Sequence, residues 1–396
     1  MSGKQSAGTD EQLVSGYAAR LLIAVSVGWL AIQAGRLVLS PMLLTVRTDL
    51  GMTNTESGLV FTVIWGLYAV LQYPSGRLSD ALSRRLLLVA GLVLVAAGFA
   101  ILGTAPTYPV FMLGAVVVGL GAGLYPTAAR ALISDLYVQR RGQAFGLHTA
   151  SGDLGGVAAA GLSALVLAVA VWRAAYLAPV LTVLLVALAL HVWGREAYGV
   201  GRADLAVRET ASRLLGNSDL RQLLVAYTLY AFVWQAATGF LPTYLRVGKG
   251  LPKWVGTISF ALLFGVGVLV KPSAGTLSDR IPRDRLAPAV AALGAIALLA
   301  LIVVPGVWLN LVAVVVFSAG LMAFPPVMQA HLMDTFPASS AGGDLGAMRS
   351  VYIGLGSLGT TYVGVVADVA TYRLAFLTLV AMLGTTALAV RRASIA

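Results

Sequence analysis

Twelve apolar stretches, separated by short polar segments, make up most of this 396-residue chain. A helix that crosses about 30 Å of hydrocarbon, rising about 1.5 Å per residue, needs roughly 20 predominantly apolar residues. The hydrophobic pattern therefore predicts an all-α integral membrane protein with twelve transmembrane helices. The predicted spans are residues 19–45, 56–76, 86–103, 109–133, 143–169, 174–193, 220–245, 255–276, 286–304, 308–332, 343–367 and 373–390.

The polar segments predict two six-helix bundles joined by a linker. The longest polar interval runs from about His191 to Asp219, and we interpret residues 194–219 as a cytoplasmic linker that can carry a surface helix. The first apolar stretch is longer than the core of a cleaved signal peptide, so we interpret the polar residues before it as a tail. The predicted order is a cytoplasmic tail at 1–18, a bundle at 19–193, the linker, a bundle at 220–390 and a cytoplasmic tail at 391–396.

A short polar motif occurs once in each half of the chain. Residues 76–85 read Gly-Arg-Leu-Ser-Asp-Ala-Leu-Ser-Arg-Arg, and residues 275–283 read Gly-Thr-Leu-Ser-Asp-Arg-Ile-Pro-Arg. A second repeat matches Gly142, Gly146, Gly156 and Arg173 with residues 200 positions later, all of the same type. Repeats of this length favour two homologous bundles, each with a basic turn at the same place.

The repeated motif resembles the signature loop of the major facilitator superfamily. That loop reads roughly Gly-x-Leu-x-Asp-x-x-Gly-Arg-Arg between helices 2 and 3 and recurs between helices 8 and 9. Ser83 and Pro282 stand where the family usually has glycine. The resemblance implies two pseudo-symmetric six-helix bundles and a secondary transporter that works by alternating access.

The composition agrees with a membrane protein and excludes several other classes. Fifty-nine percent of the residues are hydrophobic and 11% are charged, a balance that no water-soluble fold of this size needs. The net charge of +11 is spread over helix ends, without the aromatic-interleaved basic patch of a nucleic-acid-binding protein. The chain has no cysteine and three histidines. We predict no nucleic-acid partner, no metal site, no cofactor and no enzymatic activity.

The distribution of basic residues predicts the orientation in the membrane. Most of the 27 lysines and arginines fall in segments on one side of the predicted spans. Because basic residues accumulate in cytoplasmic loops, both termini and both motif loops are expected in the cytoplasm. We expect a multi-pass protein of the cell membrane whose partners are the lipid bilayer, a small molecule and the proton, and which functions as a monomer.

The signature motif predicts contacts that hold the cytoplasmic side shut, which we call the latch. Asp80 is expected to face the amino end of the span at 343–367, where the helix dipole favours a carboxylate by about 0.3–1 kcal/mol. Arg84 or Arg85 is expected to reach Asp135. The alternative is that these charges are solvated at the interface. The predicted latch consists of Gly76, Asp80, Arg84, Arg85, Asp135, Gly275, Asp279 and Arg283.

Ionisable groups inside spans are the candidates for substrate chemistry, because each costs about 2.5–3.5 kcal/mol at a helix centre and is usually functional. Arg36 lies roughly 24 Å along the helix from Arg20, too far to reach the cytoplasmic interface. Residues 35–41 resemble the first helix of the anion:cation symporter and organophosphate antiporter branch, and that resemblance implies that Arg36 contacts an anionic substrate. Arg349 is the second candidate for the anion, with interfacial snorkelling as its alternative.

Asp153 is the candidate proton site, because an acid roughly 16 Å deep can bind and release a proton when burial is balanced by a neighbouring cation. The alternative is a permanent structural pair with Arg36. His148 is the second proton candidate, whereas Arg130 and Lys271 are interpreted mainly as interfacial. Polar side chains that could orient a ligand or bond between helices are Gln33, Gln235, Gln329 and Tyr352.

These observations favour a secondary transporter that moves a small organic anion together with protons by alternating access around a midplane site. The sequence has no Walker motif for driving transport with ATP. Proton-coupled efflux of lipophilic or cationic compounds is the main alternative, although three arginines inside spans argue against a cationic substrate. A polytopic receptor or membrane-embedded enzyme is a third possibility, but no catalytic constellation is visible.

Overall fold

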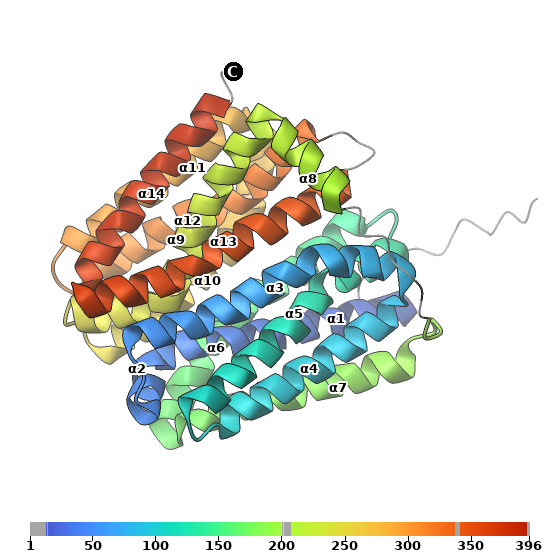
Figure 1. The fold of residues 1–396 in the computed structure, drawn as a ribbon, viewed down its shortest axis with the longest axis horizontal. Coiled ribbons are helices and arrows are strands. Elements are labelled where there is room, and N and C mark those ends of the chain that lie inside the picture. Colours follow the sequence, from blue (N-terminus) through green and yellow to red (C-terminus); the bar gives the residue numbers. More distant parts are fainter. Residues whose placement is uncertain (1–12, 14, 200, 202–206, 337–340, 394–396) are drawn as a thin grey trace, which may run out of the picture.

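A computed structural model describes residues 13, 15–199, 201, 207–336 and 341–393. Twelve helical segments in this part of the chain are long and apolar enough to cross a membrane, which confirms the predicted fold class (Figure 1). The helices are α1 (Gly16–Leu37), α2 (Leu39–Leu50), α3 (Asn54–Ala81), α4 (Arg84–Thr104), α5 (Tyr108–Leu136), α6 (Arg141–Val169), α7 (Leu177–Trp193), α8 (Val207–Gly216), α9 (Ser218–Thr243), α10 (Lys253–Ser278), α11 (Arg283–Val303), α12 (Val307–Thr335), α13 (Ala341–Val369) and α14 (Tyr372–Ala393), with short turns at Trp172–Tyr176 and Tyr244–Gly248.

The first predicted span is broken into α1 and α2 at Val38. Pro41 has no backbone N–H, so it cannot bond the carbonyl of Leu37 four residues earlier, and its ring crowds that carbonyl. Several other helices extend past the predicted ends. For example, α3 continues to Ala81 because a hydropathy window marks the apolar core of a helix and not its polar final turn.

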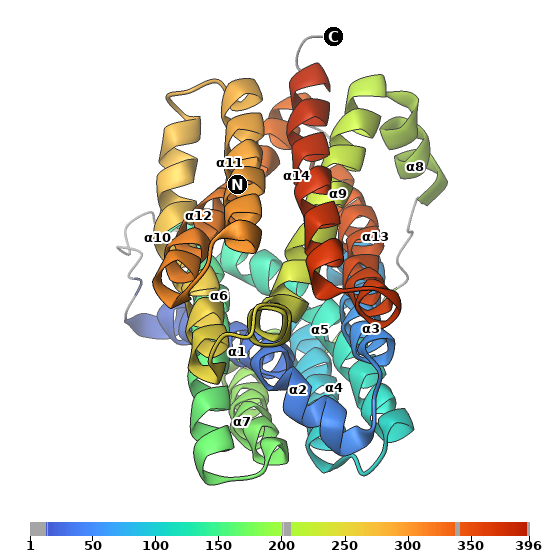
Figure 2. The same cartoon turned by 90° about the vertical axis from the view of Figure 1, so that its left-hand side faces the viewer.

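The helices form two halves, α1–α7 in the lower part of Figure 2 and α9–α14 in the upper part. Two helix pairs make most of the contact between the halves, α3 beside α13 and α6 beside α10. Because successive spans alternate in direction, α1 begins and α14 ends on the same side of the bundle. We call this the terminal side, and the other the opposite side.

The predicted linker contains α8, which lies on the terminal side and contacts both halves. The Tyr73 hydroxyl of α3 lies 3.0 Å from the Thr210 hydroxyl of α8. Arg213 of α8 donates a hydrogen bond of 2.8 Å to the buried carboxylate of Asp344 in α13. This bond raises the pKa of Arg213, so the arginine stays charged. The linker is therefore docked at the junction of α3 and α13.

On the opposite side, Asp368 at the end of α13 caps the amino end of α3. Its carboxylate accepts from the backbone N–H of Asn54 at 3.2 Å and of Thr55 at 2.8 Å, and from both of their side chains at 2.7 Å. Further along the same pair of helices, a Cβ at Gly58 would overlap the backbone of Thr360, so glycine permits the close approach. The halves are thus joined by polar contacts and close packing on this side.

Toward the terminal side, the facing helices lie further apart. A Cβ built on Gly142 or Gly146 of α6, on Gly275 of α10 or on Gly346 of α13 has no neighbouring atom within 4 Å. Gly142, Gly146 and Gly346 lie in the first two turns of their helices and Gly275 in the last turn of α10, so all four are near the terminal side. The two halves therefore pack more closely on the opposite side than on the terminal side.

We expect Asp368→Asn to weaken closure of the opposite side, because the amide has no charge with which to bind the amino end of α3. The chain has no native cysteine, so spin labels at Thr104→Cys and Val303→Cys report the separation of the halves directly. We predict about a tenfold rise in the ratio of separated to closed populations, equivalent to about 1.4 kcal/mol. Asp219→Asn on the terminal side is the control, and equal distance distributions in both variants would contradict the prediction.

Candidate functional site

Arg36 of α1 is buried between aromatic rings and is 2% exposed. Its guanidinium carbon lies 4.1 Å from the centre of the Trp65 ring and 4.6 Å from that of Tyr68, both in α3. The guanidinium also donates to the Gln33 side chain. Cation–π contacts of this kind are worth up to about 2 kcal/mol in a desolvated site. Its Nε and Nη1 have no hydrogen-bond partner among the described residues, so two donors are available to a ligand.

Arg349 and Arg130 bring two further positive charges together from different halves of the molecule. Arg349 of α13 is half-buried, bonds the Tyr68 hydroxyl and interacts electrostatically with Tyr352. Arg130 of α5, also half-buried, interacts electrostatically with both Arg349 and Tyr352. Arg130, interpreted from the sequence as interfacial, thus has its charge within range of groups from α3 and α13. Two such cations repel one another unless an anion lies between them.

Aromatic rings of the second half complete the site. The Tyr227 ring stacks on Tyr352 at 3.9 Å, and the Tyr230 ring stacks on Phe324 at 4.4 Å. Gln329 donates a hydrogen bond of 3.4 Å to the Tyr227 hydroxyl. The Tyr352 and Gln329 side chains thus belong to one buried cluster, and they orient its tyrosines.

Gln33 and Gln235 hold helices in place around this cluster. Gln33 accepts from Arg36 within α1. Gln235 of α9 donates to the backbone carbonyl of Ile353 in α13 at 2.9 Å, and its Oε1 has no partner among the described residues. Each amide therefore fixes a helix or an arginine, and Gln235 retains one free acceptor.

Asp153 of α6 is paired with Lys271 of α10, and not with Arg36 as one sequence interpretation proposed. The ammonium lies 2.6 Å from the carboxylate, and the aspartate side chain is 8% exposed. The helical phase of α6 explains the choice of partner. Gly155 packs against α1, whereas Gly156, three positions after Asp153 and on the same face, packs against α10. Lys271, interpreted from the sequence mainly as interfacial, thus has a buried carboxylate as its partner.

His148 lies one and a half helical turns before Asp153 and is 3% exposed. Its ring stacks on Trp29 of α1 at 6.2 Å, and it interacts electrostatically with Arg130. The Nδ1 atom has no partner among the described residues. His148 therefore borders the arginine cluster on a different face of α6 from Asp153.

The latch residues whose side chains the structure describes form contacts within each half. Arg84 pairs with Asp135, and Arg283 pairs with Asp334, two ion pairs related by the same offset of 199 positions. Arg85 instead donates to the backbone carbonyls of His191 and Glu196 at the end of α7. The side chains of Gly76 and Asp80 lie outside the described residues, so the predicted role of Asp80 stays a prediction.

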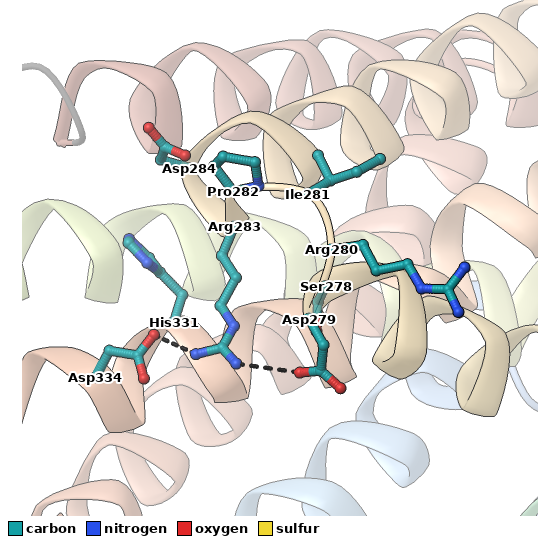
Figure 3. Close-up of a pocket in the computed structure, with 9 residues that line it drawn as sticks. All are labelled: Ser278, Asp279, Arg280, Ile281, Pro282, Arg283, Asp284, His331 and Asp334. Atoms are coloured by element: carbon teal, nitrogen blue, oxygen red, sulfur yellow. Dashed lines mark hydrogen bonds and ion pairs between the residues drawn. The ribbon is translucent and has the colours of Figure 1, made fainter.

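The second copy of the motif lines a surface pocket of about 530 Å³ on the terminal side. Figure 3 shows Arg283 between Asp279 and Asp334, with His331 beside them. The Asp279 carboxylate lies 3.5 Å from Arg283. Gly275, one turn earlier, has open space around it. Contacts of this copy described here therefore join α10, α11 and α12 within one half.

Apart from Tyr352, the aromatic members of the site were missed by the sequence analysis. Trp65 and Tyr68 are three positions apart in α3, and Tyr227 and Tyr230 have the same spacing in α9. This spacing places each pair on one helical face. The sequence signal that could have identified them was two aromatic residues three positions apart in a predicted span, in a chain that also has an arginine inside another span.

The fold and the buried charges define a polytopic membrane transporter built from two pseudo-symmetric bundles. The chain belongs to the Major Facilitator Superfamily, whose family model matches residues 25–361. The resemblance identified in the sequence is thereby confirmed, and the protein is a transporter and not an enzyme.

Similar proteins support this assignment. A probable sulfoacetate transporter of Cupriavidus necator is 26% identical over 60% of this chain and 59% of its own length. A glycerol-3-phosphate transporter of Bacillus subtilis is 23% identical over 80% of this chain and 79% of its own length. A bacterial homologue of the human lysosomal transporter Spinster, solved in an inward-facing and unoccupied conformation, superimposes with a TM-score of 0.82 at 17% identity, covering 96% of this chain and 98% of its own.

We expect Arg36→Met to leave thermal stability unchanged or to raise it, because burying an apolar side chain avoids desolvating a cation whose hydrogen bonds are incomplete. The neighbouring Leu37→Ala is the control, since loss of a buried leucine side chain costs about 2–5 kcal/mol. Thermal unfolding of the purified variants in detergent measures both. A large drop in the Arg36→Met variant would show that the arginine is structural.

Proposed function

We propose that this protein transports a small organic anion together with protons by alternating access. The observation that carries the proposal is the meeting of Arg130 and Arg349, one from each half, beside the buried Arg36. An anion between them would offset their repulsion and would contact both halves at once. A ligand held in this way links its own binding to the relative position of the halves.

The available donors favour a carboxylate, phosphate or sulfonate group. Guanidinium groups bind such oxygens with two parallel hydrogen bonds, and among the described residues Arg36 has two N–H donors without a partner and Arg349 has one. The related proteins are named as transporters of sulfoacetate and glycerol 3-phosphate, both of which carry such groups. Efflux of a cationic compound is disfavoured, because three positive charges in the site would repel it.

Asp153 is the proposed proton carrier, with His148 as the second candidate. The carboxylate is buried in the middle of α6, and its partner Lys271 belongs to the other half. Uptake of a proton by Asp153 would remove this attraction. The positive-inside distribution of basic residues supports a cell-membrane orientation with the terminal side in the cytoplasm. In that orientation, the closer packing of the opposite side corresponds to a conformation closed toward the outside.

We expect sulfoacetate or glycerol 3-phosphate to raise the melting temperature of the purified protein, and choline to leave it unchanged, because a ligand of the folded state stabilises it. Arg36→Lys and Arg349→Lys should each weaken anion binding at least about tenfold, since an ammonium lacks the bidentate geometry. Arg285→Lys, an exposed position at the start of α11, is the control. Stabilisation by choline and not by the anions would favour the efflux alternative.

We expect Asp153→Asn to abolish substrate accumulation driven by a pH gradient and to preserve counterflow exchange, because the amide resembles the protonated acid. Proteoliposomes loaded with the most strongly stabilising anion of the panel measure both activities. A purely structural Asp153–Lys271 pair predicts a different outcome, since stranding one partner costs about 3–5 kcal/mol and should depress stability and exchange together. Intact accumulation in Asp153→Asn would exclude Asp153 as the carrier.

A further inference from the structure

Among the ion pairs of the described residues, the pair of Asp153 and Lys271 is the one that joins α1–α7 to α9–α14. The other pairs lie within one half, within the linker helix α8, or between α8 and α13. Asp153 is nearly inaccessible, and the lysine side chain is 24% exposed. An ion pair that is partly shielded from water attracts more strongly than one at the surface, because the effective dielectric constant is lower. The ion pair therefore helps to hold α6 against α10.

The ion pair lies where the packing between α6 and α10 ends. On the opposite side of the pair, a Cβ at Gly156 would overlap the Phe264 ring, so the helices are in close contact there. On the terminal side of the pair, Gly146 of α6 and Gly275 of α10 have no neighbour within 4 Å of a built Cβ. The charges thus hold the helices together at the boundary between their packed and separated portions.

We propose that Lys271 is the positioning residue through which the protonation state of Asp153 controls the separation of the two halves on the terminal side. This inference rests on the proposed proton coupling and adds the group that converts a bound proton into helix movement. With Asp153 ionised, the pair ties α6 to α10. When the carboxylate takes up a proton it becomes neutral, the attraction is lost, and the lysine keeps its charge.

The position of Lys271 allows it to be released at little cost. It lies two helical turns from the carboxyl end of α10, where unpaired backbone carbonyls favour a cation. Its long side chain is already partly exposed, so the ammonium can turn toward water on the terminal side. The buried carboxylate needs the lysine only while it is charged, because a neutral acid is far less costly to bury.

Other ionisable groups near Asp153 have their own partners. Tyr230 of α9 interacts electrostatically with Asp153, but its hydroxyl donates to the backbone carbonyl of Leu321 at 2.6 Å. Arg36 of α1 is held by Gln33 and aromatic rings, and Arg130 of α5 interacts with Arg349 and with His148 of α6 itself. His148 is the group among these whose ordinary titration range overlaps physiological pH, so the experiment must separate it from Asp153.

Spin labels at Gly142→Cys and Gly275→Cys test the inference, because both positions have free space and the chain has no other cysteine. Distances between the labels are measured by double electron–electron resonance in lipid nanodiscs at alkaline and acidic pH. In the parent protein, in which the ion pair is intact, the distance distribution should shift to longer distances on acidification. Lys271→Gln and Asp153→Asn should give the long-distance distribution at both pH values, with at least about a tenfold change in the population ratio at alkaline pH.

Three further variants make the result specific. Lys271→Arg keeps the cation and should retain the pH response, which also shows that substitution at this position permits folding. Lys253→Gln makes the same change at the other end of α10 and should behave like the parent protein. His148→Gln should retain the response if Asp153 is the titrating group. Loss of the response in His148→Gln, with the response intact in Lys271→Gln, would overturn the inference.

The distances and the transport assay separate this inference from the proposed function. If Asp153→Asn loses gradient-driven accumulation but Lys271→Gln keeps the distance shift of the parent, Lys271 is not the positioning residue and the proposed proton carrier stands. If Asp153→Asn keeps accumulation, the proposed carrier is wrong, and the distances alone decide whether the pair controls separation. A parent distribution that does not change with pH overturns the inference in either case.

Discussion

The structure depends on holding positive charge away from bulk water inside an apolar bundle. A guanidinium in such a place is tolerated only where rings or polar atoms replace its hydration. Trp65 and Tyr68 do this for Arg36, and the tyrosines of α3, α9 and α13 do it for Arg349. The same rings bring α3 into contact with both halves, since Trp65 also meets Trp234 of α9 at 5.3 Å. The same aromatic side chains therefore surround the buried charge and link the two halves.

Much of the fold could be predicted because a bilayer requires long apolar helices and because the chain repeats itself. The repeat also accounts for contacts in detail, since Arg84–Asp135 and Arg283–Asp334 occupy equivalent places in the two halves. The arginines of the site were visible as costly residues in apolar spans. Helix ends and the break at Val38 were less visible, because they depend on single prolines and on polar turns that hydropathy does not register.

Partners across the site could not be read from the sequence. The repeat relates residues by position in each half, but neither member of the Asp153–Lys271 pair has a charged counterpart, since Ile353 and Gln72 stand at the equivalent positions. Which face of α6 meets α1 and which meets α10 depends on the rotation of the helix. That rotation decides whether Arg36 or Lys271 is the counterion, and amphipathicity is too weak in these helices to define it.

The contact of Asp368 with the amino end of α3 is electrostatic, unlike the close packing of α3 and α13 further along the two helices. The amino end of α3 has a second, internal cap, in which Thr53 and Glu56 satisfy each other's backbone N–H groups at 3.0 and 2.7 Å. Loss of Asp368 therefore leaves a helix end that stays folded, with two N–H groups that water can reach. Beside the close packing of α3 and α13, this side is thus held closed by the attraction of an exposed carboxylate, and attraction of that kind is screened by dissolved ions. Ionic strength on the opposite side thus becomes a variable that acts on the conformational equilibrium without entering the substrate site.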